Sequence, residues 1–317
     1  MKRTKASENE KTDQIADFAV AEKKVKTENT QFEIISADES IKKEVKNYAA
    51  RLSFYANKGV CGLRETYDTK RSLKTKLNQL VKLVKEAKHL VAITGAGIST
   101  SSGIPDFRGP NGVWTKEKEA ERKKLDLKGD NTVDPYKQMD PLCFEKAKPS
   151  PTHDILTQLH KDGILKFLVS QNVDGLHLRS GYPREAISEL HGNLYTEKCE
   201  DCAKEFFGEH DVGGMGARPT GNNCTACGGV LRDTVLDWDT PLPEKDFESA
   251  QTHCEKSDLI LCLGTSLRIV PVADMPLLAS KFVVVNLQAT PLDDDATLVI
   301  RAKVDNVMKS LIQNLNL

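Results

Sequence analysis

The chain has 317 residues, and its 45 Lys and Arg almost balance its 46 Asp and Glu, for a formal net charge of −1. This balance gives no overall basic field that would point to nucleic acid, and no apolar run approaches the length that spans a bilayer. The start, Met1-Lys2-Arg3-Thr4-Lys5, has no apolar segment behind it and argues against a secretory signal, so the eight cysteines are expected in a reducing compartment, where metal binding is commoner than disulfides.

Residues 1–45 form a charged segment with many Lys and Glu and very few aromatic residues. Such a segment cannot bury enough apolar surface to offset its ordering entropy, so it is predicted to be a disordered tail. It contains two basic clusters, at 2–5 and 23–26. These clusters fit a nuclear import address, and they fit a merely solvated tail equally well.

A helix and a buried strand are predicted after the tail. Five apolar residues recur at helical spacing: Leu73, Leu77, Leu80, Val81 and Val84. The apolar run 90–93 then reads as a parallel strand, and Gly95 and Gly97 behind it allow a tight turn whose backbone can approach a phosphate. Position 100, where a hydride-transferring dinucleotide enzyme normally has a third glycine, is Thr100, so this loop alone is a weak signal.

Three further apolar runs, 167–169, 259–263 and 282–285, alternate with helical patterns near 152–161, 246–256 and 272–280. Alternating strands and helices indicate an α/β fold with a Rossmann-like parallel sheet that is covered on both faces. Two stretches break the rhythm: 110–150 is charged and contains proline, and 193–232 holds paired cysteines. Both are predicted to be insertions that form a smaller lobe.

Polar side chains follow the predicted strands directly. Gln171, Asn172 and Asp174 come after one strand, Gly264-Thr265-Ser266 after another, and Asn286 and Gln288 after a third. Ligands of open α/β sheets collect at these carboxyl ends, so the three groups are expected to line one site. A plain turn is the alternative for 172–174.

Cys199-x-x-Cys202 and Cys224-x-x-Cys227 form two tight pairs. Each pair can present two thiolates from one turn, and together they predict a closed structural zinc site in a ribbon module. A redox-active pair and a nucleic-acid-binding ribbon are the alternatives. The isolated cysteines are expected to be small buried apolar residues: Cys61, Cys143, Cys254 and Cys262.

Several motifs in this order resemble the sirtuins, the NAD-dependent protein deacylases. They are the glycine turn, then 104–109 (IPDFRG), 171–174 (QNVD), 190–193 (LHGN) and the cysteine pairs. The resemblance covers about 47–317 and implies a catalytic domain over 46–317. Stretches similar to the nuclear, chromatin-associated branch are 47–62, 109–115, 176–181 and 285–288.

The resemblance implies a role for each matching residue. His191 is the general base, with Asn172 and Asp174 completing the catalytic set. Residues implied to contact NAD are Gly95, Ala96, Gly97, Thr100, Phe107, Arg108, Trp114, Gln171, Gly264, Thr265, Ser266, Asn286, Gln288 and Val304. A neutral imidazole suits a base that acts on a ribose hydroxyl near physiological pH.

In the reaction that the family implies, the acyl oxygen of a modified lysine attacks C1′ of the nicotinamide ribose. Nicotinamide, free lysine and an O-acyl-ADP-ribose are the products. The expected substrates are acyl-lysine proteins, histone tails first, in the nucleus and with chromatin as a partner; no membrane is expected. The peptide is expected near Asp237-Trp238, where this chain reads 236–239 (LDWD) in place of the Phe-Gly-Glu-like sequence usual in sirtuins. Mono-ADP-ribosyl transfer and a catalytically silent chromatin-binding module remain as alternatives.

Overall fold

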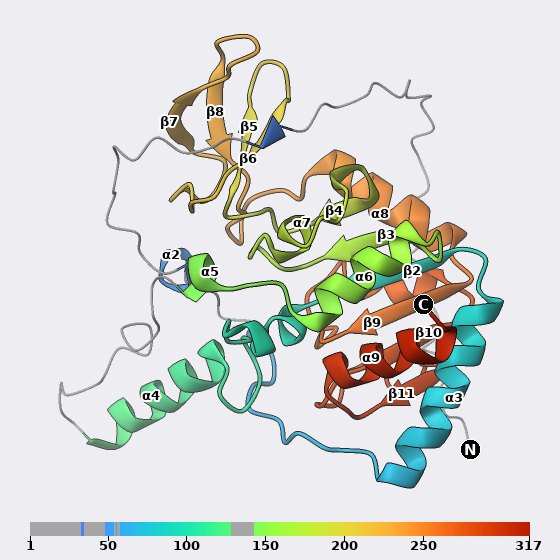
Figure 1. The fold of residues 1–317 in the computed structure, drawn as a ribbon. Coiled ribbons are helices and arrows are strands. Elements are labelled where there is room, and N and C mark those ends of the chain that lie inside the picture. Colours follow the sequence, from blue (N-terminus) through green and yellow to red (C-terminus); the bar gives the residue numbers. More distant parts are fainter. Residues whose placement is uncertain (1–32, 35–47, 54, 56–57, 128–142) are drawn as a thin grey trace, which may run out of the picture. The chain divides into compact units, whose positions relative to one another are not determined.

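The computed structural model describes residues 33–34, 48–53, 55, 58–127 and 143–317 (Figure 1). The predicted tail, apart from 33–34, and both of its basic clusters lie outside these residues. The boundaries expected for the tail and the catalytic domain therefore stay predictions. Among the described helices, none is both long and apolar enough to cross a membrane.

A sheet of six parallel strands forms the core of the larger lobe. In sheet order the strands are β11 (Leu298–Ile300), β10 (Phe282–Val285), β9 (Leu259–Leu263), β2 (Leu90–Thr94), β3 (Leu165–Ser170) and β4 (Ile187–Glu189). The chain runs outward from β2 to β4, then returns to β9 beside β2 and runs outward to β11. This is the doubly wound order, and it confirms the predicted Rossmann-like sheet.

Successive residues of each strand enter two different apolar layers. Leu90 and Ala92 pack with α3 (Lys70–Glu86), α6 (Pro151–Lys161) and α9 (Val304–Leu315) on one face (Figure 1). Val91 and Ile93 pack on the other face, against α8 (Glu244–Lys256). Both faces are therefore buried, which is why the strands read as continuous apolar runs.

The helical pattern expected at 272–280 is wrong. Only a single 3₁₀ turn, η4 (Met275–Leu278), forms there. Pro271 and Pro276 interrupt the stretch, and proline cannot donate the backbone hydrogen bond that a longer helix needs. The helices that complete the described chain are α2 (Tyr48–Arg51), α4 (Val113–Leu127), α5 (Cys143–Lys146) and α7 (Leu176–Arg179), with a 3₁₀ turn, η3, at Arg184–Ala186.

A second sheet forms the smaller lobe that the sequence predicted. Its order is β1 (Glu33–Ile34), β6 (Glu205–Phe207), β5 (Thr196–Cys199), β8 (Val230–Asp233) and β7 (Pro219–Asn223). One residue ties this lobe to the core. The guanidinium of Arg184 donates to Glu205 on β6 at 2.8 and 3.2 Å, and to Asp246 on α8 at 2.9 and 3.0 Å.

Candidate active site

The site lies where the sheet order reverses, between β2 and β9. The turn after β2 continues into two 3₁₀ turns, η1 (Ala96–Ile98) and η2 (Thr100–Ser102), and it packs against the turn after β9. A Cβ atom on Gly95 or Gly97 would lie 2.8 Å from the backbone of Gly264, and Gly264 itself has a left-handed φ of 58°. Glycine is needed here because two main chains meet without room for a side chain.

These turns border a pocket of about 300 Å³, within the size range of small-molecule sites. Most of the predicted catalytic and cofactor-binding residues line it: Gly95, Ala96, Gly97, Phe107, Arg108, Trp114, Gln171, Asn172, Asp174, His191, Gly264, Thr265, Ser266, Asn286 and Gln288. Two expected residues do not. Thr100 is exposed and bonds its own turn through the oxygen of Gly97 at 3.1 Å, and Val304 is buried in the apolar layer at the start of α9.

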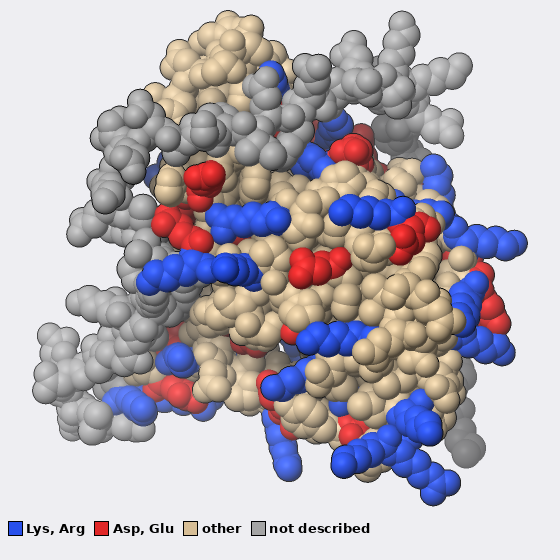
Figure 2. Space-filling model, in the orientation of Figure 1, with Lys and Arg blue, Asp and Glu red and all other residues tan. Residues whose placement is uncertain are grey.

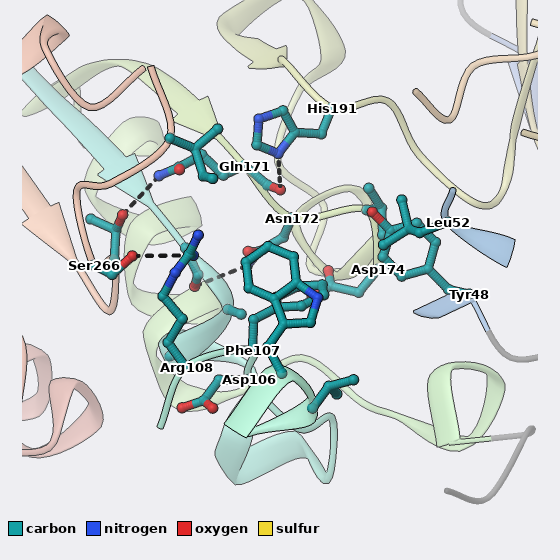
Figure 3. Close-up of a pocket in the computed structure, with 18 of the residues that line it drawn as sticks. Tyr48, Leu52, Asp106, Phe107, Arg108, Gln171, Asn172, Asp174, His191 and Ser266 are labelled. Carbon is teal, nitrogen blue, oxygen red and sulfur yellow. Dashed lines mark hydrogen bonds between the residues drawn. The ribbon is translucent and has the colours of Figure 1, made fainter. Parts of the chain in front are cut away.

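His191 is half-buried on the wall of this pocket (Figure 3). Its Nδ1 lies 2.9 Å from the main-chain oxygen of Gln171. A carbonyl oxygen can only accept, so Nδ1 carries the hydrogen and Nε2 of the neutral ring keeps its lone pair. Burial lowers the pKa of His191 below the usual value for histidine, although the bond to Gln171 opposes this effect. The ring is therefore neutral and basic at physiological pH.

The loop between β3 and α7 is tied to the glycine turn by its own polar side chains. Ser99 donates to one carboxylate oxygen of Asp174 at 2.7 Å, and the backbone N–H of Leu176 donates to the other at 3.0 Å. The amide of Asn172 donates to the oxygen of Gly95 at 3.2 Å. Asp174 is only 3% exposed, so it acts as an anchor for this loop and not as a solvated charge.

Two side chains bond the turn after β9: Gln171 reaches it from this loop, and Arg108 reaches it from the 104–109 segment. Gln171 Nε2 donates to Thr265 Oγ1 at 2.9 Å, and Arg108 Nη1 donates to Ser266 Oγ at 3.4 Å. The Arg108 guanidinium stacks on the ring of Trp114 at 4.4 Å. Burial lowers the pKa of Arg108 to about 10, so the side chain is still a cation at neutral pH. The pocket thus combines the fixed positive charge of Arg108 with neutral hydrogen-bonding groups and with the carboxyl groups of Asp106, Asp174 and Asp237.

Sequence reasoning missed a wall of the pocket that comes from the segment before α3. Tyr48, Leu52 and Tyr55 line the pocket, and the ring of Tyr55 stacks on Trp238 with centroids 4.1 Å apart. Trp238 Nε1 also donates to the oxygen of Ser53 at 3.0 Å. The stretch 47–62 was noticed only as part of the resemblance, and nothing in its pattern indicated a contact so far along the chain.

Asp106 was given no role beyond its motif, and Asp237 was expected only to lie near the peptide. Asp106 lines the pocket and accepts from the backbone N–H of Gly109 at 2.8 Å, while burial raises its pKa. Asp237 accepts from the N–H of Ser53 at 3.1 Å and from the Ser53 hydroxyl. Residues 236–239 form no regular strand, so the edge expected to pair with a peptide is a loop with a turn at 238–239, and the earlier segment holds it in place.

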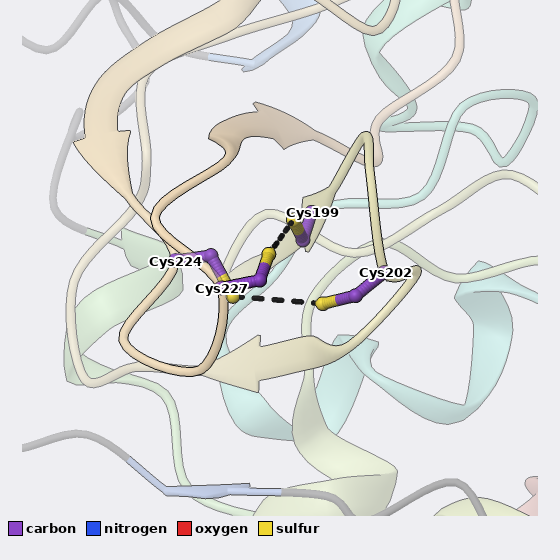
Figure 4. Close-up of side chains that lie close together, drawn as sticks. All are labelled: Cys199, Cys202, Cys224 and Cys227. Atoms are coloured by element: carbon purple, nitrogen blue, oxygen red, sulfur yellow. Dashed lines mark hydrogen bonds between the residues drawn. The ribbon is translucent and has the colours of Figure 1, made fainter.

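The four paired cysteines meet at one point in the smaller lobe (Figure 4). Their sulfur atoms all lie within 4.8 Å of one another, with 3.4 Å between Cys199 and Cys227 and 3.6 Å between Cys202 and Cys224. Four zinc–sulfur bonds of about 2.3 Å in a tetrahedron place sulfurs about 3.8 Å apart, so the cluster fits a structural zinc ion. A closed set of four thiolates leaves no position for an activated water.

The isolated cysteines differ from one another. Cys254 and Cys262 are fully buried in the apolar layer on the α8 face, as expected. Cys61 is only half-buried and packs beside Val113 and Trp114. The side chain of Cys143 lies outside the described residues.

Comparison with known proteins agrees with this geometry. Residues 95–271 match the model of the Sir2 family, more than half of the chain, and the chain belongs to this family. The predicted resemblance to sirtuins is confirmed. The NAD-dependent protein deacetylase SRT1 of Arabidopsis thaliana is 46% identical over 276 residues, which cover 85% of this chain and 55% of the plant protein. The NAD-dependent protein deacetylase Sirt6 of Drosophila melanogaster is 40% identical over 278 residues, which cover 84% and 83%.

Among solved structures, a complex described as Sir2, p53 peptide and NAD+ is 28% identical with a TM-score of 0.55, and the match covers 76% of this chain and 99% of that one. This chain spans about half the length of the SRT1 proteins that it matches: 55% of the one from Arabidopsis thaliana and 54% of the one from Oryza sativa subsp. indica.

Proposed function

We propose that this protein is an NAD-dependent protein-lysine deacylase whose general base is His191. The observation that carries the proposal is the fixed tautomer of this imidazole, which keeps a basic nitrogen on the wall of a pocket at the sheet reversal. Support also comes from the relatives, which are named NAD-dependent protein deacetylases. The Sir2 structures that this chain resembles include complexes with NAD+ and with acetylated peptide.

The residues that line the pocket fit NAD. Arg108 and the backbone N–H of Ala96 suit the phosphates, because cations and the first N–H of a helical turn attract anions. The N–H groups of Gly95 and Gly97 already donate to the oxygens of Leu263 and Gly264. The hydroxyls of Thr265 and Ser266 and the amides of Asn286 and Gln288 suit ribose hydroxyls. When bound, NAD supplies a nicotinamide–ribose bond whose cleavage exposes C1′ to the acyl oxygen of the substrate.

This chain's own residues then have separate tasks. Gln171 and Asn172 are placed to hold the nicotinamide ribose, and Asp174 keeps their loop against the glycine turn. His191 Nε2 takes the proton from a ribose hydroxyl as that hydroxyl attacks the carbon of the acyl group. Phe107 and Trp114, whose rings lie 4.8 Å apart, exclude water that would otherwise hydrolyse NAD.

The proposed substrate is an acyl-lysine in an extended protein segment, with histone tails as the leading case and the nucleus as the place of action. Asp237 and Trp238 line the pocket beside Leu236. Backbone pairing of a peptide with this loop would be β-strand addition. The histone and chromatin assignments rest on the resemblance of 47–62, 109–115, 176–181 and 285–288 to the nuclear, chromatin-associated branch.

The test mixes the protein with NAD and an acetyl-lysine histone peptide and follows both products. We expect nicotinamide and free lysine to form in equal amounts, and nicotinamide to stay at background without peptide. Nicotinamide with a stable ADP-ribose adduct on protein would show mono-ADP-ribosyl transfer instead. No nicotinamide with any acetyl, succinyl or myristoyl peptide would overturn the proposal in favour of a silent binding module.

A further inference from the structure

Positive charge is concentrated on one helix, although the whole chain is almost neutral. Seven basic residues stand in 70–88, and the one acidic residue among them is Glu86: Lys70, Arg71, Lys74, Lys76, Lys82, Lys85 and Lys88. All except Lys76 are exposed. In Figure 2, basic side chains project from the region of α3 at the right and lower right, with few acidic ones among them. The near-zero net charge therefore hides a strongly basic surface, which we call the α3 face.

Most of this charge is not neutralised within the protein. Lys76 pairs with Asp68, and Lys82 lies 3.9 Å from Glu86. Lys70, Arg71, Lys74, Lys85 and Lys88 form no ion pair with any residue that the structure describes. The neighbouring helix α9 adds exposed Lys303 and Lys309 beside this face. Helix α4, by contrast, alternates basic and acidic residues along 116–123.

The apolar side of α3 is already occupied. Leu80 and Val84 are buried, and Leu73, Leu77 and Val81 pack on the same apolar layer. A helix that lies in a membrane surface needs a free apolar face to insert among the lipids. The α3 face offers only charged and polar groups, so it favours a hydrophilic polyanion as partner over a bilayer.

We infer that the α3 face binds the phosphate backbone of duplex DNA. The helix has 17 residues and is about 25 Å long. One strand of B-DNA presents a phosphate about every 3.4 Å along the axis, so about seven phosphates lie within that length. The exposed basic residues lie near the start of the helix (70, 71 and 74) and near its end (82 and 85), so each end can reach a phosphate. This contact goes beyond the deacylase activity and does not depend on it.

The residue types indicate contact with backbone and not with bases. Six of the seven basic residues are lysines, which act as flexible point charges and lack the fork with which arginine reads guanine. The face carries no row of aromatic rings on which single-stranded bases could stack; Tyr67, just before α3, is the one strongly exposed aromatic side chain in the described part of the chain. We therefore expect binding that is independent of base sequence and that favours the duplex over single strands.

The test uses the full chain and a fluorescent 20-base-pair duplex, with anisotropy measured from 50 to 200 mM salt. The variant combines Lys74→Gln, Lys82→Gln and Lys85→Gln, because glutamine keeps helix propensity while it removes charge. The control combines Lys116→Gln, Arg122→Gln and Lys123→Gln on α4, which removes the same charge from a mixed surface. Thermal melting and the rate on a free acetyl-lysine peptide check that both variants fold.

We expect the α3 variant to bind the duplex more weakly and to lose less affinity with salt. Each lost phosphate contact makes the slope of log binding constant against log salt shallower by about 0.9, so three lost contacts change it by about 2.7. The binding constant of the variant then falls about 40-fold less than that of the parent between 50 and 200 mM salt. The control should bind like the parent protein. Equal weakening in both variants, unchanged binding in the α3 variant, or binding to phosphatidylserine vesicles but not to the duplex would each overturn the inference.

Discussion

The main-chain oxygen of Gln171 accepts a hydrogen bond from Nδ1 of His191 at 2.9 Å. The same residue donates through its side chain to Thr265 on the opposite side of the pocket. Gln171 therefore fixes both the tautomer of the proposed base and the distance between the two turns that surround the cofactor.

His191→Ala is expected to reduce deacylation by at least about 100-fold, because a positioned general base contributes about 10²–10⁴ to a rate. NAD binding should survive in part, since the other residues that line the pocket are unchanged. Nicotinamide release and a direct NAD titration measure the two effects. His160→Ala is the matched control: His160 Nδ1 also bonds a main-chain oxygen, that of Leu165 at 3.0 Å, but it lies outside the pocket. A rate near that of the parent protein for His191→Ala would remove His191 from its role.

The pH dependence of kcat/KM should show an acid limb below the ordinary histidine pKa of about 6.5. Burial lowers the pKa of His191, so the neutral ring persists as pH falls through 6.5 and is lost only as pH reaches the lowered value. Activity should therefore exceed half of its maximum at pH 6.5 and should fall at more acid pH. A rate profile with NAD and peptide at low concentrations measures this limb. An acid limb centred above pH 7 would contradict a desolvated base.

Gly97→Ala is expected to destabilise the fold by about 1–3 kcal/mol, since overpacking of a tight contact costs this much. The added Cβ would lie 2.8 Å from backbone atoms of Gly264, which cannot move aside as a side chain could. Gly208→Ala is the control, because its Cβ would meet nothing closer than an oxygen of Tyr195 at 3.8 Å. Denaturant unfolding and an NAD titration compare the two variants. Equal stabilities would show that the two turns can separate freely.

Cys199→Ser is expected to release zinc and to unfold the smaller lobe. Cys199 is the last residue of β5 and is buried, so its loss would leave three thiolates and an open, weaker site. Cys61→Ser removes a thiol outside the cluster and should keep one zinc per chain. Metal analysis after gel filtration, with limited proteolysis of 193–232, reports both outcomes. Zinc retained by Cys199→Ser at the parent's level would contradict a four-thiolate site.

Arg184→Met is expected to cost about 3–5 kcal/mol of stability, because it leaves buried carboxylates without their cation. The Arg184 side chain is 17% exposed, and those of its partners Glu205 and Asp246 are 14% and 11% exposed. Arg232→Met is the control: its pair with Glu200 is 39% and 35% exposed, so about 0–1 kcal/mol is expected. Denaturant melts give both values. Similar small losses would mean that the two lobes are held together by their apolar contacts.

The strands that are buried on both faces were the easiest to predict from the sequence. Strands β9 and β10 were predicted residue for residue, because strands buried on both faces are unbroken apolar runs. Strands β4 and β11 have three residues each, too few to show a period. Helix α4 was hidden inside an expected insertion, since its many charges leave only a weak apolar side.

The site was predicted where its residues follow strands and missed where the chain folds back from far away. Gln171, Asn172 and Thr265 come directly after β3 and β9, so the sheet brings them together. Tyr55 reaches Trp238 across more than 180 positions of the sequence, and no local pattern reports such a pairing. Val304 was expected to contact the cofactor, but the fold places it in the apolar layer and away from the pocket.

The wall built by Ser53 and Tyr55 has a practical consequence for anyone who trims this protein. A fragment limited to 95–271 would retain His191 and all four cysteines of the cluster. It would lose the aromatic partner of Trp238 at one end of the pocket, and Asn286 and Gln288 at the other. It would also lose the central strand β2 together with β10 and β11, so inactivity of such a fragment would report a broken sheet and an opened pocket, not a faulty base.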